Sequence, residues 1–214
     1  MPSGRAREEA CPVTDRSLDV SASAAPHPDA PAAPALTVVP DLPAPVEVQV
    51  LAAVQGVVAR PPAVAVARGM SHFGEHALGW LALGAVGAAV DRPRRAEWLW
   101  SAAAVAFAHG ASIGVKRVVR RPRPDHPSVE VLVSTPSRLS FPSSHATSTT
   151  AAAVLYGGLL RSRVPYAVVP VMALSRLVLG VHYPTDVATG SALGAGVALV
   201  ARRVIPRLVD RKKR

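Results

Sequence analysis

Several residue types on which other kinds of protein depend are scarce in this sequence. The only cysteine in 214 residues is Cys11, which excludes a disulfide framework and a cysteine-based metal site. Aromatic residues make up only 4% of the chain, whereas a soluble core of this size usually relies on Phe, Tyr and Trp as bulky filler. Half of the residues are hydrophobic, mostly Ala, Val, Gly and Leu, a mixture typical of closely packed membrane helices.

Acidic residues are also scarce. The chain has 14 Asp and Glu against 24 Lys and Arg, which gives a formal net charge of +10. Such a surplus suits nucleic acid, an anionic membrane surface or an anionic substrate. Aromatic and basic residues do not alternate as they do on single-strand-binding surfaces, and no zinc-finger spacing occurs, so we expect no nucleic-acid partner. Membrane lipids and an anionic substrate remain as the expected partners, and nothing in the sequence indicates an oligomeric state.

Three segments flank the apolar part of the chain. Residues 1–44 are rich in Pro, Ala, Ser and charge, which predicts a disordered leader, and they lack the basic-then-apolar order of a signal peptide. Residues 45–61 are too short and too polar to span a bilayer, which takes about 20 residues, so they predict an amphipathic helix on the membrane surface. Residues 207–214 form a basic tail.

The segment between them, residues 62–206, predicts a membrane-embedded domain. We expect five hydrophobic helices, at 70–90, 96–117, 144–160, 164–182 and 185–204. These segments are apolar nearly all round rather than along one stripe, which argues against a soluble five-helix bundle. The predicted fold is therefore all-α, a polytopic membrane bundle with about five transmembrane helices. A sixth span drawn from residues 45–60 is the alternative.

Helix directions place three polar clusters on one face of this bundle. The first is KRVVRRPRP, residues 116–124, at the end of the second predicted helix, and it contains Lys116 and Arg123. Taken alone, such residues are ordinary anchors that reach lipid headgroups. The second is FPSSHATSTT, residues 141–150, where Ser143, Ser144 and His145 open the third helix. A helix start binds anions through its free N–H groups and dipole, although an ordinary serine N-cap has the same sequence.

The third cluster is SRLVLGVHYPTDV, residues 175–187, at the junction of the last two helices. A charge such as Arg176 at the centre of a bilayer costs roughly 2.5–3.5 kcal/mol, so it needs a reason. Pro184 favours the first turn of a new helix, which puts Asp186 near that helix start. There its carboxylate can accept a hydrogen bond from one nitrogen of His182 and leave the other unprotonated, as in a catalytic dyad. A structural Arg–Asp pair is the alternative.

Together the clusters predict a site for a dianionic phosphate. Lys116, Arg123 and Arg176 supply fixed cations, and two histidines supply a nucleophile and a separate acid. His76 and His109 lie on apolar helices, where we expect packed, hydrogen-bonded side chains rather than ligands.

The three clusters resemble the signature of the type 2 phosphatidic acid phosphatases, membrane lipid phosphatases that share their site with vanadium haloperoxidases. That signature is K-x6-R-P, P-S-G-H and S-R-x5-H-x3-D. Lys116 with Arg123-Pro124 matches the first part, and residues 175–186 match the third in full. The second part matches except that Ser144 replaces glycine, which adds a side chain to the pocket. The resemblance covers residues 62–204.

This resemblance implies a mechanism. His182 attacks phosphorus to form a phosphohistidine, Asp186 orients its ring, and His145 protonates the leaving oxygen and then activates water. No metal or other cofactor is implied. Arg121, one dipeptide before Arg123, is a candidate assistant. The oxygens of the phosphate are held by Lys116, Arg123, Ser143, Ser144 and Arg176.

The resemblance also implies a lipid phosphate as substrate. The Ala- and Arg-rich sequence is similar to short bacterial enzymes assigned to polyprenyl-linked phosphates, among them decaprenylphosphoryl-5-phosphoribose. Polyprenyl pyrophosphates and phosphatidate-type lipids stay open. A vanadate-dependent haloperoxidase and a non-catalytic basic membrane protein are the rival interpretations.

The distribution of basic residues predicts which face carries the site. Twelve of the 24 Lys and Arg residues lie opposite it, in 91–95, 161–163 and 202–214. On the site face only six remain once three in the site and three in the leader are set aside. The positive-inside rule then places the site outside the cytoplasm of a multi-pass cell-membrane protein.

Overall fold

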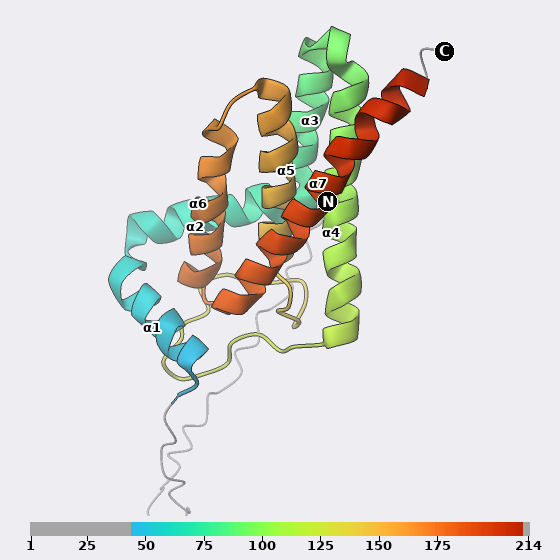
Figure 1. Cartoon of the computed structure of the whole chain (residues 1–214). Coiled ribbons are helices and arrows are strands. Elements are labelled where there is room, and N and C mark those ends of the chain that lie inside the picture. Colours follow the sequence, from blue (N-terminus) through green and yellow to red (C-terminus); the bar gives the residue numbers. More distant parts are fainter. Residues whose placement is uncertain (1–43, 212–214) are drawn as a thin grey trace, which may run out of the picture. The chain divides into compact units, whose positions relative to one another are not determined.

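A computed structural model describes residues 44–211, which form α-helices, short 3-10 turns and one long loop, with no β-strand in that part of the chain. The leader predicted for residues 1–44 lies outside the described residues except for Ala44, and so do the last three residues of the predicted basic tail. The helices in Figure 1 are α1 (Val46–Val58), α2 (Pro61–Gly74), α3 (Leu78–Val90), α4 (Arg95–Val119), α5 (Ser144–Leu160), α6 (Val168–Val178) and α7 (Pro184–Arg211).

The observed helix ends follow the expected ones in the middle of the chain and depart from them later. The segments expected at 96–117 and 144–160 correspond to α4 and α5. The helix expected to end at 182 stops at Val178, because Gly180 adopts the left-handed conformation (φ +67°) with which helices commonly end. The last helix continues to Arg211, so part of the predicted basic tail is helical.

The helix expected over 70–90 is instead two helices with a sharp break. His76 and Ala77 between them have φ values of 50° and 60°. Glycines make the bend sterically possible: a side chain on Gly79 would overlap the ring of Phe73, and one on Gly74 would overlap the ring of His145. As a result, α2 runs across the direction of α3 and α4 (Figure 1), and its last turn reaches the region where the polar clusters meet.

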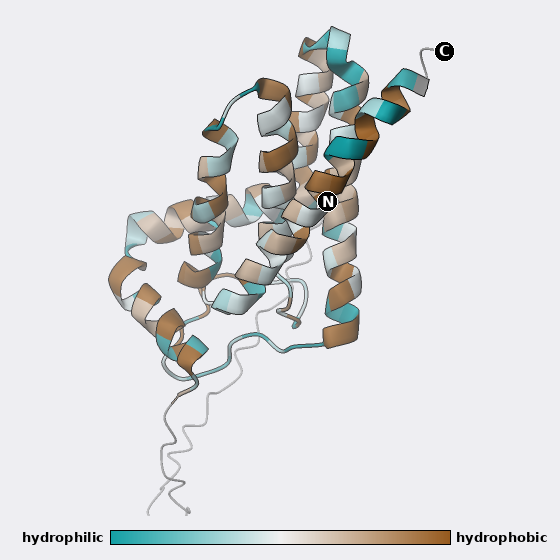
Figure 2. Cartoon of the chain, viewed as in Figure 1, coloured by the Kyte–Doolittle hydropathy of each residue, from teal (hydrophilic) through white to brown (hydrophobic). Residues whose placement is uncertain are grey.

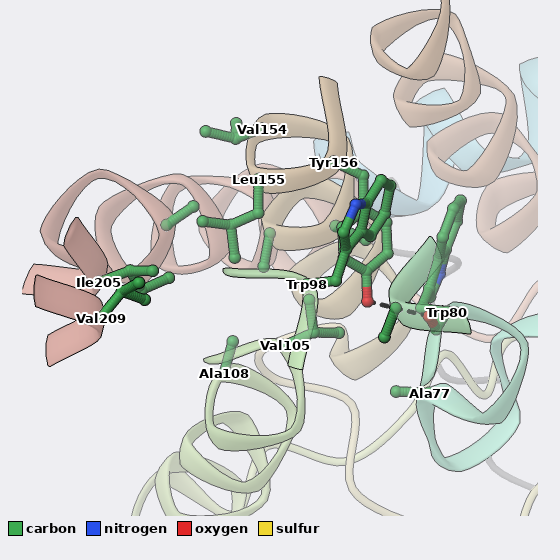
Figure 3. Packing of buried hydrophobic residues seen from close by; sticks show 14 residues of the cluster. Ala77, Trp80, Trp98, Val105, Ala108, Val154, Leu155, Tyr156, Ile205 and Val209 are labelled. Carbon is green, nitrogen blue, oxygen red and sulfur yellow. Dashed lines mark hydrogen bonds between the residues drawn. The ribbon is translucent and has the colours of Figure 1, made fainter. Parts of the chain in front are cut away.

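The described bundle is built around α5, which packs against α2, α3, α4, α6 and α7. Its side chains from Ser144 to Gly157 are almost all buried, and many carry hydroxyl groups. Figure 3 shows the aromatic end of this core, where the Tyr156 hydroxyl donates to the carbonyl oxygen of Trp80 at 2.9 Å. The Trp80 indole in turn donates to the Thr149 hydroxyl at 3.1 Å. Polar atoms inside the bundle are thus paired between helices.

Hydrophobic residues are distributed along the helices (Figure 2), and many of the large ones lie on the outer surface. Large side chains such as Val86, Phe107 and Leu199 are 58%, 67% and 54% exposed, while hydroxyl groups lie inside. Such a distribution is typical of helices packed within a bilayer. Two stretches of the described chain, Pro61–Val90 and Arg92–Val119, are long and apolar enough to cross a membrane, and the first contains the break at His76. They overlap the first two predicted spans.

Close approach of α7 to α5 gives a first prediction. A methyl group at Gly194 would overlap the backbone of Thr147, whereas one at Gly196 would meet no atom within 4 Å. We expect Gly194→Ala to lower the stability by about 1–3 kcal/mol, as overpacking does, and Gly196→Ala to leave it unchanged or raise it. Thermal unfolding of both purified variants, followed by circular dichroism in detergent, measures the difference. Equal melting temperatures for the two variants would show that the helices are not in close contact here.

Candidate active site

The three polar clusters meet around one cavity of about 450 Å³. The end of α4, the start of α5, the end of α6, the 179–183 connection and the loop after α4 enclose it, and the last turn of α2 closes one side. Six of the eight predicted site residues line it: Lys116, Arg123, Ser144, His145, Arg176 and His182. Ser143 and Asp186 lie behind its wall. Residues from five parts of the sequence thus converge as the helix directions predicted.

Three cations face this cavity, and none of them forms an ion pair with a carboxylate of the described residues. Lys116 donates to the carbonyl oxygen of Ser140 at 2.8 Å, and it is 8% exposed. Arg176, 2% exposed, donates to the Ser71 hydroxyl at 3.1 Å and to the Ala67 carbonyl at 3.3 Å. Within residues 44–211, neither of these side chains forms an ion pair.

Arg123 is the third cation. Its guanidinium donates to the carbonyl oxygens of Val181 at 2.6 Å and Ser137 at 2.8 Å, and it too has no ion-pair partner in the described chain. Burial lowers the pKa of Arg123 to about 10, which leaves it charged at neutral pH. Lys116 and Arg176 are buried, and buried charges without a counter-ion are strongly unfavourable, so this arrangement is suited to an anion in the cavity. The alternative interpretation, a structural pair between Arg176 and Asp186, does not occur among the described residues.

The hydrogen bonds of His182 indicate its tautomer. Nη1 of Arg123 lies 3.3 Å from Nε2 of His182. Because a guanidinium only donates, Nε2 is the accepting, unprotonated nitrogen and the proton sits on Nδ1. Burial, reinforced by the charges of Arg123, Lys116 and Arg176, holds the pKa of His182 well below its usual value. The imidazole is therefore neutral and has a lone pair on the nitrogen that faces the cations.

Asp186 stands behind His182 at the start of α7. One carboxylate oxygen lies 3.5 Å from Nδ1 of His182, too poorly placed for a hydrogen bond, and accepts the N–H of Tyr183 at 2.8 Å. The other oxygen accepts from Nη1 of Arg121 at 3.1 Å. Catalytic hydrogen bonds are often long before substrate binds. Arg121, which the sequence offered as an assistant for the phosphate, is thus turned away from the cavity and toward Asp186.

The two serines at the start of α5 differ in position. Ser143 is the N-cap: its hydroxyl accepts the N–H of Ala146 at 3.5 Å, and its own N–H donates to the carbonyl of Asp186 at 2.9 Å. The hydroxyl of Ser144, where the family motif has glycine, accepts from Ser112 of α4 at 2.7 Å. The extra side chain of Ser144 is therefore accommodated by a contact with α4, whereas Ser143 does not line the cavity and bonds to the backbone of α5 and α7.

Ser71 is a site residue that the sequence did not indicate. Nε2 of His145 lies 3.0 Å from the carbonyl oxygen of Ser71, and since a carbonyl only accepts, this nitrogen carries a proton. The hydroxyl of Ser71 accepts from Arg176. One residue of α2 thus orients both an acid and a cation. No local signal could have revealed it, because only the break after Gly74 brings this turn to the cavity.

Two histidines that were expected to be packed also line the cavity. The rings of His76 and His109 lie 6.4 Å apart, and Nδ1 of His109 is buried without a hydrogen-bond partner in the described residues. No cluster of three or more His, Cys, Asp or Glu side chains between residues 44 and 211 is arranged for a metal ion. The rim is exposed and mostly polar, with His72, Glu75, His76, Arg117 and Ser134.

The sequence of this chain is similar to that of known proteins. A family model described as the PAP2 superfamily matches residues 97–210. A Mycobacterium tuberculosis protein named decaprenylphosphoryl-5-phosphoribose phosphatase is 55% identical over 159 residues, which cover 74% of this chain and 90% of that protein. A Mycolicibacterium smegmatis protein of the same name is 58% identical over 142 residues, which cover 66% and 79%.

Two solved structures share the fold. A PAP2-type phosphatidylglycerolphosphate phosphatase from Bacillus subtilis matches with a TM-score of 0.64 and 21% identity, over 75% of this chain and 85% of that one. Aquifex aeolicus LpxE matches with a TM-score of 0.60 and 15% identity, over 72% and 93%. At these identities the likeness concerns the fold alone.

Proposed function

The chain belongs to the PAP2 superfamily and is a phosphatase of that family, and we propose that it removes a phosphate monoester from a polyprenyl-linked phosphosugar such as decaprenylphosphoryl-5-phosphoribose. The family match confirms the resemblance seen in the three motifs. The observation that carries the proposal is a set of three cations around two histidines in one cavity: two of the cations are buried, and none has an ion-pair partner among the described residues. The names of the relatives support the substrate.

The first step is transfer of the phosphoryl group to His182. Lys116, Arg123 and Arg176 hold the phosphate oxygens, together with the N–H groups that open α5. The lone pair on Nε2 of His182 forms the P–N bond while the P–O bond to the leaving group breaks. His145, protonated on both ring nitrogens when the dianionic phosphate is bound, passes one proton to the leaving alkoxide and becomes neutral. Asp186 stabilises the positive charge that develops on the His182 ring.

The second step returns the enzyme to its starting state. Neutral His145 now accepts a proton from a water molecule, whose oxygen attacks the phosphohistidine. The P–N bond breaks, inorganic phosphate leaves, and His182 recovers its lone pair. The three cations supply the charge neutralisation that a metal ion supplies in other phosphoryl-transfer enzymes, so the step needs no metal.

The volume of the cavity and the polar side chains at its rim favour a sugar next to the phosphate. At about 450 Å³ it is of the size that holds a small molecule rather than a phosphoryl group alone. Its rim offers hydrogen-bonding side chains, among them His72, Glu75 and His76, and the unpaired nitrogen of His109 adds a further one inside. These groups suit the hydroxyls of a pentose better than the acyl esters of phosphatidate. The hydrophobic lipid is then left outside, against the apolar helix surfaces.

The membrane arrangement that fits this function has five spans, with α1 at the interface and the cavity on the extracytoplasmic face. Its support is the separation of charge along the bundle. The basic turns before α4 and after α5 lie together, since Arg94 donates to the Leu159 carbonyl at 2.6 Å, and the guanidinium of Arg202 lies near Gly158. The residues that line the cavity belong to the other ends of α4 and α5, the end of α4 and the start of α5, and these two ends lie on the same side of the bundle (Figure 1). The positive-inside rule then gives the orientation.

Phosphate release from a small panel of lipids tests the proposal. Purified protein is assayed on a polyprenylphosphoryl-5-phosphoribose, a polyprenyl pyrophosphate and a phosphatidate, each with and without EDTA. We expect kcat/KM to be highest for the phosphoribose lipid by about tenfold or more, which is about 1.4 kcal/mol of discrimination, and insensitive to EDTA. Equal or faster turnover of phosphatidate would contradict the substrate. Strict dependence on a divalent ion would contradict the mechanism, and bromide oxidation with vanadate but no phosphate release would favour a haloperoxidase.

A further inference from the structure

A chain of polar contacts links α1 to Asp186. The carboxylate of Glu47 accepts from Nη2 of Arg121 at 2.5 Å, and Nη1 of Arg121 donates to Asp186 at 3.1 Å. Glu47 also accepts the hydroxyl of Thr185 at 2.6 Å and its N–H at 3.2 Å. The sequence predicted α1 as a helix on the membrane surface, yet this polar side chain bonds to the protein.

Asp186 depends on Arg121 for its charge balance. The aspartate is 0% exposed, and an ionised carboxylate in such a place needs a cation or several hydrogen-bond donors. Among the described residues Arg121 is the only Lys or Arg that forms an ion pair with it. The N–H of Tyr183 holds the oxygen that faces His182, so the guanidinium completes the orientation of the group.

Arg121 is itself held from three sides. Its guanidinium lies 4.0 Å from the centre of the Tyr183 ring, donates to the Thr185 hydroxyl at 2.7 Å, and pairs with Glu47. Burial opposes ionisation of Glu47, but the hydrogen bonds from Thr185 and Arg121 outweigh it and hold the pKa of this carboxyl below its usual value. A long, flexible arginine is thereby kept in one orientation.

A second anchor fixes the other end of α1. The side-chain amide of Gln55 donates to the carbonyls of Glu130 at 2.7 Å and Val178 at 3.0 Å, and accepts the N–H of Glu130 at 3.0 Å. A Cβ on Gly180 would overlap the Glu130 carbonyl, so glycine permits this contact. Glu47 and Gln55 lie eight residues, about 12 Å, apart along the helix. Gln55 therefore bonds to Val178, just before the 179–183 connection that carries His182, and Glu47 bonds to Thr185, just after it.

From these contacts we infer that α1 supports the catalytic dyad formed by His182 and Asp186. Glu47 and Arg121 are positioning residues that hold Asp186 in place beside His182. Neither residue lines the cavity, so neither touches the phosphate. The inference rests on the proposed function, because it takes His182 as the nucleophile. It assigns a role to a helix that lies outside the part of the chain matched by the family model.

The test compares Glu47→Gln, Arg121→Gln and Arg121→Lys with two matched controls. Gln49→Ala lies on the same helix, and the Gln49 side chain bonds only to Ala44 within the described chain. Arg120→Gln removes a neighbouring exposed arginine that donates to its own helix. The kcat and KM for a phosphoribose lipid are measured per mole of monodisperse protein. Removal of groups that support a reacting residue commonly lowers activity about tenfold to a hundredfold.

We expect kcat to fall about tenfold in Glu47→Gln and about a hundredfold in Arg121→Gln, with KM within about twofold of the unchanged protein. Arg121→Lys should recover part of the lost kcat. The double variant Glu47→Gln/Arg121→Gln should have a kcat no lower than that of Arg121→Gln, because Glu47 and Arg121 act as one unit. If Arg121→Gln does not fold, Glu47→Gln, whose side chain is 31% exposed, carries the test.

Two results would overturn the inference: a kcat for Glu47→Gln equal to that of Gln49→Ala, or a loss that lies in KM alone. Either would leave the proposed function standing as long as the unchanged protein and both controls release phosphate. Failure of the unchanged protein and both controls to release phosphate from any lipid would instead reject the proposed function.

Discussion

Replacement of His182 by alanine is expected to reduce phosphate release by about 10⁴-fold or more, because it removes the only group that bonds to phosphorus. The neutral ring has its unprotonated Nε2 toward Arg123 and its Nδ1 toward Asp186. Among the described side chains that line the cavity, no other has an unprotonated nitrogen surrounded by the cations Lys116, Arg123 and Arg176. Initial rates on a lipid phosphate, over enzyme concentrations spanning several orders of magnitude, measure the loss.

His126→Ala is the matched control for this variant. Its ring nitrogen lies 2.8 Å from the hydroxyl of Ser128 in the long loop, and it does not line the cavity. The control should retain the activity of the unchanged protein. If His182→Ala keeps more than about 1% of that activity, His182 is not the nucleophile.

Replacement of Arg176 by methionine should separate activity from stability. The guanidinium is 2% exposed and has no carboxylate partner in the described residues, and the proposed mechanism assigns it to phosphate binding at the expense of folding. Loss of one preorganised donor to a developing charge lowers kcat by about 10²–10³-fold. Replacement of an uncompensated buried charge by an apolar side chain is neutral or stabilising. We therefore expect a large loss of kcat with a melting temperature that is unchanged or higher.

Arg92→Met, an exposed arginine at the opposite end of the bundle, is the matched control and should change neither quantity. Phosphate release and thermal unfolding on the same preparations give both readouts. A fall of activity and melting temperature together in Arg176→Met would show that Arg176 serves the fold, through its bonds to Ser71 and Ala67, rather than the reaction.

Much of this site could be predicted from the sequence because it depends on signals that are local. Pro184 starts α7, mainly hydrophobic segments form α5 (17 residues) and α4 (25 residues), and antiparallel connections return the polar clusters to one end. The convergence of the clusters needs only helix direction and residue type. The choice of Arg123 over Arg121 as the arginine that lines the cavity came from the spacing of the family motif.

The features that escaped prediction depend on contacts between distant segments. The break at His76 follows from the packing of Phe73 over Gly79, and an apolar run that contains glycine does not reveal it. The docking of α1 depends on Glu47 meeting an arginine 74 residues later. Polar residues in a short helix look the same in a sequence whether they face lipid headgroups or the protein. Ser71 became a site residue only because that break carried it to the cavity.

Detection of a covalent intermediate would decide most directly how this cavity acts. The protein is mixed with a lipid substrate labelled in its terminal phosphate, quenched in alkali within milliseconds, digested and sequenced by mass spectrometry. We expect phosphate on His182, formed and lost at least as fast as turnover and absent from His182→Ala. Turnover without any labelled protein, or label on another residue such as His145, would show that the cations and histidines of this cavity work by a different route.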